Sequence, residues 1–151
     1  MKKTLMILIN VFVVLVVLAL VVIAFVVVKG AALDKESKQF VDAAVPAIAA
    51  EWNIAEIQNR ASPEFKASVK AANLEKLVRM VRELGKFKAY NGAKGYAYPY
   101  VSSEHGKLLV ATYVATADFE NGPAEIKISL VKHGDRWQLF GLHVTSKVFS
   151  E

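Results

Sequence analysis

The sequence predicts an α+β domain that follows a single N-terminal transmembrane helix. Two observations lead to this prediction. An uncharged apolar run extends from Leu5 to Val28, and near Phe87 the hydrophobic pattern changes from helical spacing to alternation. Helices followed by consecutive strands are typical of a domain whose helices pack on one face of an antiparallel sheet. At 151 residues the chain has room for one such domain.

The run Leu5–Val28 has the length and composition of a membrane span. As a helix it measures about 36 Å, and the hydrocarbon core of a bilayer is about 30 Å thick. A cleaved signal peptide is the alternative, but its apolar core is only about 7–15 residues long and small residues follow it directly. Here Lys29 separates the run from Gly30. We therefore expect residues 1–30 to be a retained anchor and residues 31–151 to form the domain.

The charges that flank the span indicate its orientation. Lys2 and Lys3 stand before it without acidic neighbours, whereas basic and acidic residues alternate after it. By the positive-inside rule we expect a cytoplasmic N-terminus and a periplasmic or extracytoplasmic domain. Asn10 is the one strongly polar residue of the span, and it either hydrogen-bonds to a partner helix in the membrane or reaches the headgroups.

The first part of the domain has helical spacing. Asp34 is expected to cap a helix whose apolar positions fall between Phe40 and Trp52, and Pro46 should kink or divide this helix. Ser62 and Pro63 provide an N-cap and a first helical residue, so a second, short helix should begin there.

A clearer amphipathic helix follows. Asn73 is expected to cap it, its apolar stripe runs from Leu74 to Leu84, and Gly85 should end it. Helical spacing does not continue beyond this glycine.

Alternation then predicts an antiparallel meander. Turns are expected at Asn121-Gly122 and at His133-Gly134-Asp135, because both have turn-forming composition. Pro99 suits an edge strand, and Gly141 permits a bulge or bend in the last strand. The expected strands contain Tyr96–Tyr100, Leu109–Phe119, Ile126–Leu130 and Trp137–Val148.

The chain resembles small bacterial domains of the cystatin-like, nuclear-transport-factor-like superfamily. Three segments carry the resemblance: Leu84–Lys88, the hairpin at Phe119–Gly122, and the ending Gly134–Val144. It covers about residues 34–148. The resemblance implies a curved sheet wrapped around helices as a cone. Some relatives use this cone as an enzyme pocket and many use it as a dimerisation or docking surface.

Composition and motifs argue against several functions. The net charge is +5, but from Gly30 onward 16 Lys and Arg face 14 Asp and Glu, so the domain lacks the basic footprint of a nucleic-acid binder. The absence of cysteine removes disulfides, thiolate catalysis and cysteine-ligated metals. No histidine pair or histidine and acid stand at helical ligand spacing, and no phosphate-binding loop is present. The sequence predicts neither a metal site nor a cofactor.

His143 is a weak catalytic candidate. If it faces inward from the last strand, it could meet Tyr113 or Asp118 and act as an acid or base, as isomerase-like relatives pair tyrosines and carboxylates inside the cone. The alternative is a structural or exposed histidine. Trp137 and His143 share a face only if no bulge separates them.

Two groups of residues are candidates for partner binding. Tyrosines at alternate positions form either a partner-binding strip or part of the core. Basic residues on the last helix are either solvated or attracted to an acidic partner or to anionic headgroups. The tyrosines are Tyr90, Tyr96, Tyr98 and Tyr100, and the basic residues are Lys76, Arg79 and Arg82.

These features favour a non-catalytic accessory or assembly subunit of a membrane protein complex over an enzyme. The expected partners are that complex and the lipid bilayer, with a homodimer as an alternative and no role for nucleic acid. The alternative function is a membrane-tethered small-ligand-binding or enzymatic cone, which a cone filled by Trp137 and Phe140 would exclude. A pilin-like subunit is disfavoured, because the apolar run has no early Glu and no Gly-Phe processing site.

Overall fold

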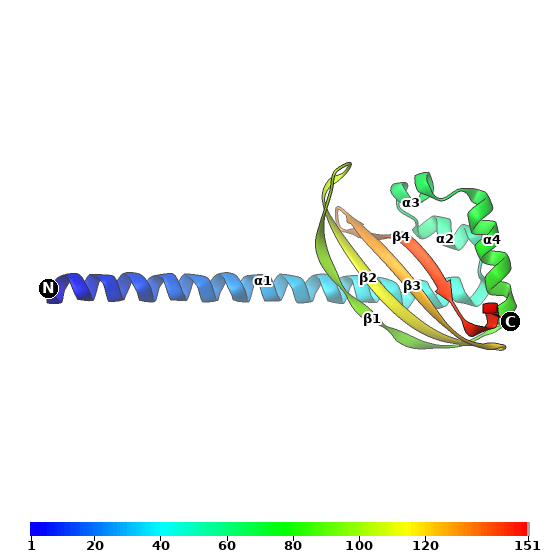
Figure 1. Ribbon diagram of the computed structural model, residues 1–151, viewed down its shortest axis with the longest axis horizontal. Coiled ribbons are helices and arrows are strands. Elements are labelled where there is room, and N and C mark those ends of the chain that lie inside the picture. Colours follow the sequence, from blue (N-terminus) through cyan, green and yellow to red (C-terminus); the bar gives the residue numbers. More distant parts are fainter. Residues whose placement is uncertain (151) are drawn as a thin grey trace. The chain divides into compact units, whose positions relative to one another are not determined.

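The computed structural model describes residues 1–150 and has the α+β architecture that the sequence predicts (Figure 1). A long N-terminal apolar helix is followed by short helices and then by a four-stranded antiparallel sheet. The chain divides into two compact units, Met1–Leu33 and the domain that begins at Asp34.

The first unit belongs to helix α1, which extends from Lys2 to Glu51. The side chains of residues 5–28 are exposed to solvent, and the most apolar window of the helix is 0% buried. A helix with these properties is long and apolar enough to cross a membrane. Segments of this kind serve as single-pass anchors or as signal sequences.

Two expectations about α1 are wrong. Asp34 does not cap a helix, because α1 is already helical from Lys2 onward. Pro46 does not divide the helix, which continues through it to Glu51. Trp52 ends α1 instead, with a positive φ of 46° and its amide bonded to the carbonyl of Ile48.

Three short helices follow. Helix α2 (Ile54–Arg60) has an Asn53 cap, and α3 (Pro63–Ser68) begins with the predicted Ser62 cap, whose Oγ accepts a hydrogen bond from the amide of Phe65. The longer α4 extends from Ala71 to Val81, followed by the 3-10 turn η1 (Arg82–Leu84).

The predicted Asn73 cap of α4 is wrong, because the N-cap residue is Lys70 and Asn73 lies inside the first turn. Gly85 does follow the end of the helical segment, with a φ of +76°. This conformation suits glycine and confirms the predicted stop.

The sheet is a meander with strand order β1-β2-β3-β4. Its strands are β1 (Phe87–Ser102), β2 (Gly106–Phe119), β3 (Gly122–His133) and β4 (Arg136–Thr145). β4 ends earlier than predicted, because the 3-10 turn η2 (Lys147–Ser150) follows it.

One face of the sheet packs against the domain part of α1. Val41, Val45 and Ile48 of α1 are 0–2% exposed, and so are Ile128 and Leu130 of β3. We call this buried side of the sheet the core face and the opposite side the outer face. Trp52 extends the core at the end of α1, where its ring stacks on Phe119 with a centroid separation of 6.1 Å.

A bulge changes the phase of β4 next to Gly141, the residue at which the sequence permits a bulge or bend. Ser129 pairs with Gly141 but Leu130 pairs with Leu139, so Phe140 is the extra residue. Before the bulge Leu139 is buried, and after it Val144 is buried. The bulge therefore reverses which side chains of β4 face the core.

Candidate functional site

The outer face of the sheet carries the large apolar side chains that the domain leaves exposed. Tyr96, Tyr98 and Tyr100 are 63%, 36% and 50% exposed, and they alternate along β1 as predicted. These fractions exclude the core-packing alternative for the three tyrosines. The exposed large apolar residues of the described domain are Tyr96, Tyr98, Tyr100, Val101, Val114 and Phe140. We call Tyr96, Tyr98, Tyr100, Val114 and Phe140 the aromatic face.

Tyr90 does not join this face. A bulge separates it from the other tyrosines, since Tyr90 pairs with Ala117 and Ala93 already pairs with Ala115. Its hydroxyl donates to the Asp42 carboxylate at 2.7 Å, which joins β1 to α1. Burial and this hydrogen bond raise the pKa of Tyr90 well above its usual value. Tyr90 therefore holds the helix to the sheet.

The free edge of β1 is poorly suited to pairing with another strand. The Asp34 carboxylate accepts a hydrogen bond from the amide of Ala97 at 2.6 Å, so this amide points away from β2. In an antiparallel ladder the amides two residues away point to the same side, and one of these positions is Pro99, which has no amide hydrogen. The amide of Ala97 is already occupied and Pro99 has no amide hydrogen, so this edge offers few donors to an added strand. A partner is thus directed to the face of the strand.

A groove adjoins the aromatic face between α3 and the end of the β1–β2 hairpin. Its volume is about 650 Å³. Tyr100, Leu108 and Phe140 form its apolar part, and Glu64 and Glu104 are among its polar residues. Phe140 reaches this groove because it is the bulged residue of β4. A cleft of this size with apolar and polar walls has room for a protruding side chain.

A contact between a carboxylate and a histidine fixes one wall of the groove. The carboxylate of Glu64 in α3 lies 2.9 Å from Nε2 of His133 at the end of β3. Burial opposes ionisation of Glu64, but hydrogen bonds from its backbone, from Ser62 and from His133 hold the pKa of this carboxyl below its usual value. The amide of Ser62 also donates to the carbonyl of Leu139 at 2.8 Å, so α3 is attached to β4 on its other side.

The catalytic candidates do not converge. Tyr113 is 1% exposed on the core face, where its hydroxyl donates to the Asp34 carbonyl at 3.1 Å and lies 2.9 Å from Ser37 Oγ. His143 follows the bulge and is exposed. Asp118 accepts a hydrogen bond from Asn91 at 2.9 Å.

The strand register separates these three residues further. His143 pairs with Lys127, which pairs with Val114, so His143 lies on the outer face and Tyr113 on the core face. Asp118 is four residues beyond Val114 along β2, a distance of about 14 Å. The arrangement offers no position where one reacting atom would touch all three side chains.

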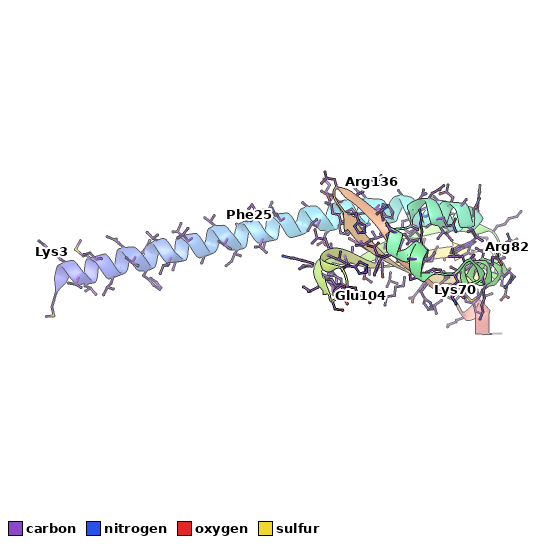
Figure 2. The ribbon with its side chains drawn as sticks, turned by 90° about the horizontal axis from the view of Figure 1, so that it is seen from above. Lys3, Phe25, Lys70, Arg82, Glu104 and Arg136 are labelled. Carbon is purple, nitrogen blue, oxygen red and sulfur yellow. The ribbon has the colours of Figure 1, made fainter. Side chains whose placement is uncertain are left out.

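The basic candidates occupy a different part of the domain. Lys76, Arg79 and Arg82 are exposed on α4 and η1, whose Leu74 and Val78 are buried. Within residues 1–150, none of the three basic side chains forms an ion pair. Figure 2 shows Arg82 at one end of the domain and Glu104 at the other. The basic residues and the aromatic face are therefore separate surfaces.

Asn10 is exposed on α1 inside the apolar segment. Both expectations for it, contact with a partner helix and contact with headgroups, remain predictions. The described residues contain no group of three or more histidine and acidic side chains that could hold a metal ion.

No family model, curated protein or solved structure matches this chain.

Sequence reasoning missed the residues that attach the helices to the sheet. Ser37 is a polar residue with 0% exposure. Its hydrogen bond with Tyr113 depends on the position of Tyr113 in β2, which the sequence around Ser37 does not report. The Glu64–His133 pair joins residues that are distant in sequence. The sequence predicts a helix cap at Asp34, but its carboxylate instead accepts a hydrogen bond from the amide of Ala97 in β1.

Proposed function

We propose that this chain is a non-catalytic, single-pass accessory subunit of a membrane protein complex. In this proposal α1 crosses the bilayer with its N-terminus in the cytoplasm, and the domain lies on the periplasmic or extracytoplasmic side. The aromatic face docks on the part of a partner membrane protein that projects from the bilayer. The supporting observation is the exposure of Tyr96, Tyr98 and Tyr100 together on one face of an edge strand.

The aromatic face has the composition of an interface. Tyrosine is enriched at protein interfaces because its ring buries a large apolar area and its hydroxyl still finds a polar partner. The rings of Tyr96 and Tyr98 lie 5.5 Å apart, so they present a continuous aromatic surface. The groove beside Tyr100 and Phe140 can receive a side chain from the partner. Aromatic residues next to such pockets commonly provide most of the binding energy.

The alternative function, a small-ligand-binding or enzymatic cone, has less support. It requires His143, Asp118 and Tyr113 to surround a cavity, but they lie on different faces or far apart along the sheet. Trp137 is 8% exposed and contributes to the core, whereas Phe140 lies outside it. The cystatin-like cone itself stays part of the proposal: a sheet with helix α1 on its core face is compatible with that architecture.

Site-specific photo-crosslinking in native membranes tests the docking surface. A photoreactive phenylalanine analogue replaces Tyr98 in one version of the full chain and Ala72, an exposed residue of α4, in a matched control. The proposal expects a defined adduct between position 98 and one membrane protein, and no such adduct from position 72. The same partner should be lost on mild-detergent purification of Tyr98→Asp and retained with Ala72→Asp.

Three results would contradict this proposal. An adduct of position 98 with a second copy of the chain would identify a homodimer instead. An adduct only from the control position would move the interface to the basic side of α4. A chain that migrates as a monomer, with no adduct at either position, would remove the accessory function.

A further inference from the structure

We propose that the end of the β1–β2 hairpin, formed by Tyr100, Val101 and Ser102, inserts into the headgroup region of the bilayer that α1 anchors. The inference goes beyond docking on a protein partner and rests on one part of the proposed function, the anchoring of α1. Its occupant is the lipid interface, and the protein partner of the proposed function then covers the rest of the aromatic face, with Tyr96 and Tyr98.

Each side of the hairpin end carries one exposed apolar side chain, next to the polar turn at residues 103–105 and to Lys107, which pairs with Val101. Val101 is 76% exposed and Tyr100 is 50% exposed. Adjacent residues of a strand point to opposite faces, so one of these side chains projects on each side of the hairpin. A flat protein interface would cover one side and leave the other in water. Lipid surrounds an inserted tip and covers both sides, so a two-sided apolar tip fits the membrane interface better.

The composition of the tip suits the headgroup region. No charged residue occurs between Gly95 and Ser103. Tyrosine is enriched at the membrane–water boundary, because its ring enters the apolar layer while its hydroxyl stays with the headgroups. Glu104 and Lys107 at the turn balance each other in charge. The tip therefore has no electrostatic requirement for anionic lipid, and a neutral phosphatidylcholine surface should suffice.

Contacts inside the domain place the tip at the end where the chain leaves towards the span. Tyr90 of β1 binds Asp42 of α1, and Ala97 of β1 binds Asp34 of α1. β1 therefore advances along α1 in the direction of its N-terminus. From Ala97 the strand continues for about 17 Å to Ser102, and Figure 1 shows the β1–β2 hairpin curving away from α1 towards its turn. Figure 1 shows the β1–β2 turn projecting past the β3–β4 turn.

The covalent connection keeps this end close to any bilayer that holds the apolar run. Only residues 29–33 lie between Val28 and Asp34. Even a fully extended chain spans at most about 20 Å over this interval, whatever the orientation of the domain. The tip lies within about 17 Å of Ala97, and the amide of Ala97 binds Asp34 at the start of the domain, so a tilt of the domain on this short connection brings the tip to the headgroups.

Fluorescence of single-cysteine variants tests the inference, and the chain is suited to it because it contains no cysteine. The full chain is labelled with an environment-sensitive dye at Val101→Cys, at Ala72→Cys as an exposed control on α4, and at Leu18→Cys in the apolar run. The three proteins are reconstituted into pure phosphatidylcholine vesicles, with and without nitroxide-labelled lipid. Fluorescence of the buried Trp52 and Trp137 confirms that each domain is folded.

We expect blue-shifted emission and strong nitroxide quenching at positions 18 and 101, and water-like, unquenched emission at position 72. A protected position 18 with a water-exposed position 101 would overturn the tip insertion and leave the anchor intact. A water-exposed position 18 would overturn the anchor, and the tip insertion with it. Protection of position 101 in native membranes but not in pure lipid would assign the tip to a protein partner and refute lipid contact.

Discussion

The hydroxyl of Tyr113 should contribute measurably to the stability of the domain. It donates to the Asp34 carbonyl at 3.1 Å and lies 2.9 Å from Ser37 Oγ, and Ser37 and Tyr113 are both almost fully buried. In Tyr113→Phe the Asp34 carbonyl keeps a second neighbour, because Ser37 Oγ also donates to it at 3.2 Å. The substitution therefore leaves no buried acceptor without a donor. The free energy of unfolding should fall by the contribution of an ordinary internal hydrogen bond, about 1 kcal/mol.

A double-mutant cycle separates this network from simple packing. Ser37→Ala alone should also cost about 1 kcal/mol, and the double variant should cost less than the sum by about 0.5–1 kcal/mol, because the two hydroxyls contact each other. Tyr98→Phe is the matched control. Its hydroxyl forms no hydrogen bond with any described residue, so its effect should stay within about 0.5 kcal/mol.

Urea unfolding of the full chain in detergent provides the measurement. The protein has two tryptophans, Trp52 and Trp137, and both are buried in the domain, so their fluorescence reports on the domain alone. The midpoint should fall in Tyr113→Phe while the slope stays constant. If Tyr113→Phe and Tyr98→Phe had equal midpoints, the reasoning would be refuted.

Three further outcomes are expected. In Gly95→Ala the new Cβ would overlap the carbonyl oxygen of Thr112, so the urea midpoint should fall by the equivalent of about 1–3 kcal/mol, and an unchanged midpoint would contradict this register. Burial and its hydrogen bond raise the pKa of Tyr90, so the unfolded chain loses the hydroxyl proton at a lower pH than the folded chain does. The free energy of unfolding should therefore decline above about pH 10. Urea midpoints measured across that range should decline less steeply in Tyr90→Phe. Because the pKa of Glu64 is lowered in the folded domain, its contribution to the free energy of unfolding is present above about pH 4.5 and is lost as the pH falls. Glu64→Gln should therefore flatten the acid limb of the curve of stability against pH. Parallel acid limbs in the two proteins would show that the contact with His133 is not stabilising.

The sequence predicted the elements better than the places where they begin. The apolar run, the change of periodicity near Phe87 and the turn residues carry strong local signals, and these elements are present. The expected caps at Asp34 and Asn73 were wrong, because α1 and α4 begin earlier than their first capping residues suggest. Pro46 sits inside a helix that packs against the sheet, and this packing offsets the lost hydrogen bond.

The candidate site was predictable only in part. Alternation along β1 correctly placed Tyr96, Tyr98 and Tyr100 on one face, because the period of a strand is fixed. Which face is buried depends on α1, and local sequence does not report this. His143 illustrates the limit: a single extra residue at Phe140 decides that it points outward. The pairs that attach helices to strands depend on tertiary structure, and neither Ser37 nor Glu64 carries a local signal of its partner.

The contacts of Asp34 also determine how the domain would bear mechanical load. Tension transmitted along the chain from residue 33 enters at Asp34, whose carbonyl accepts from Tyr113 of β2 and whose carboxylate accepts from Ala97 of β1. Both bonds meet the strands within their length rather than at their ends. A pull on the tether is therefore shared by two paired strands at once, which resists the sequential peeling of one strand from a terminus.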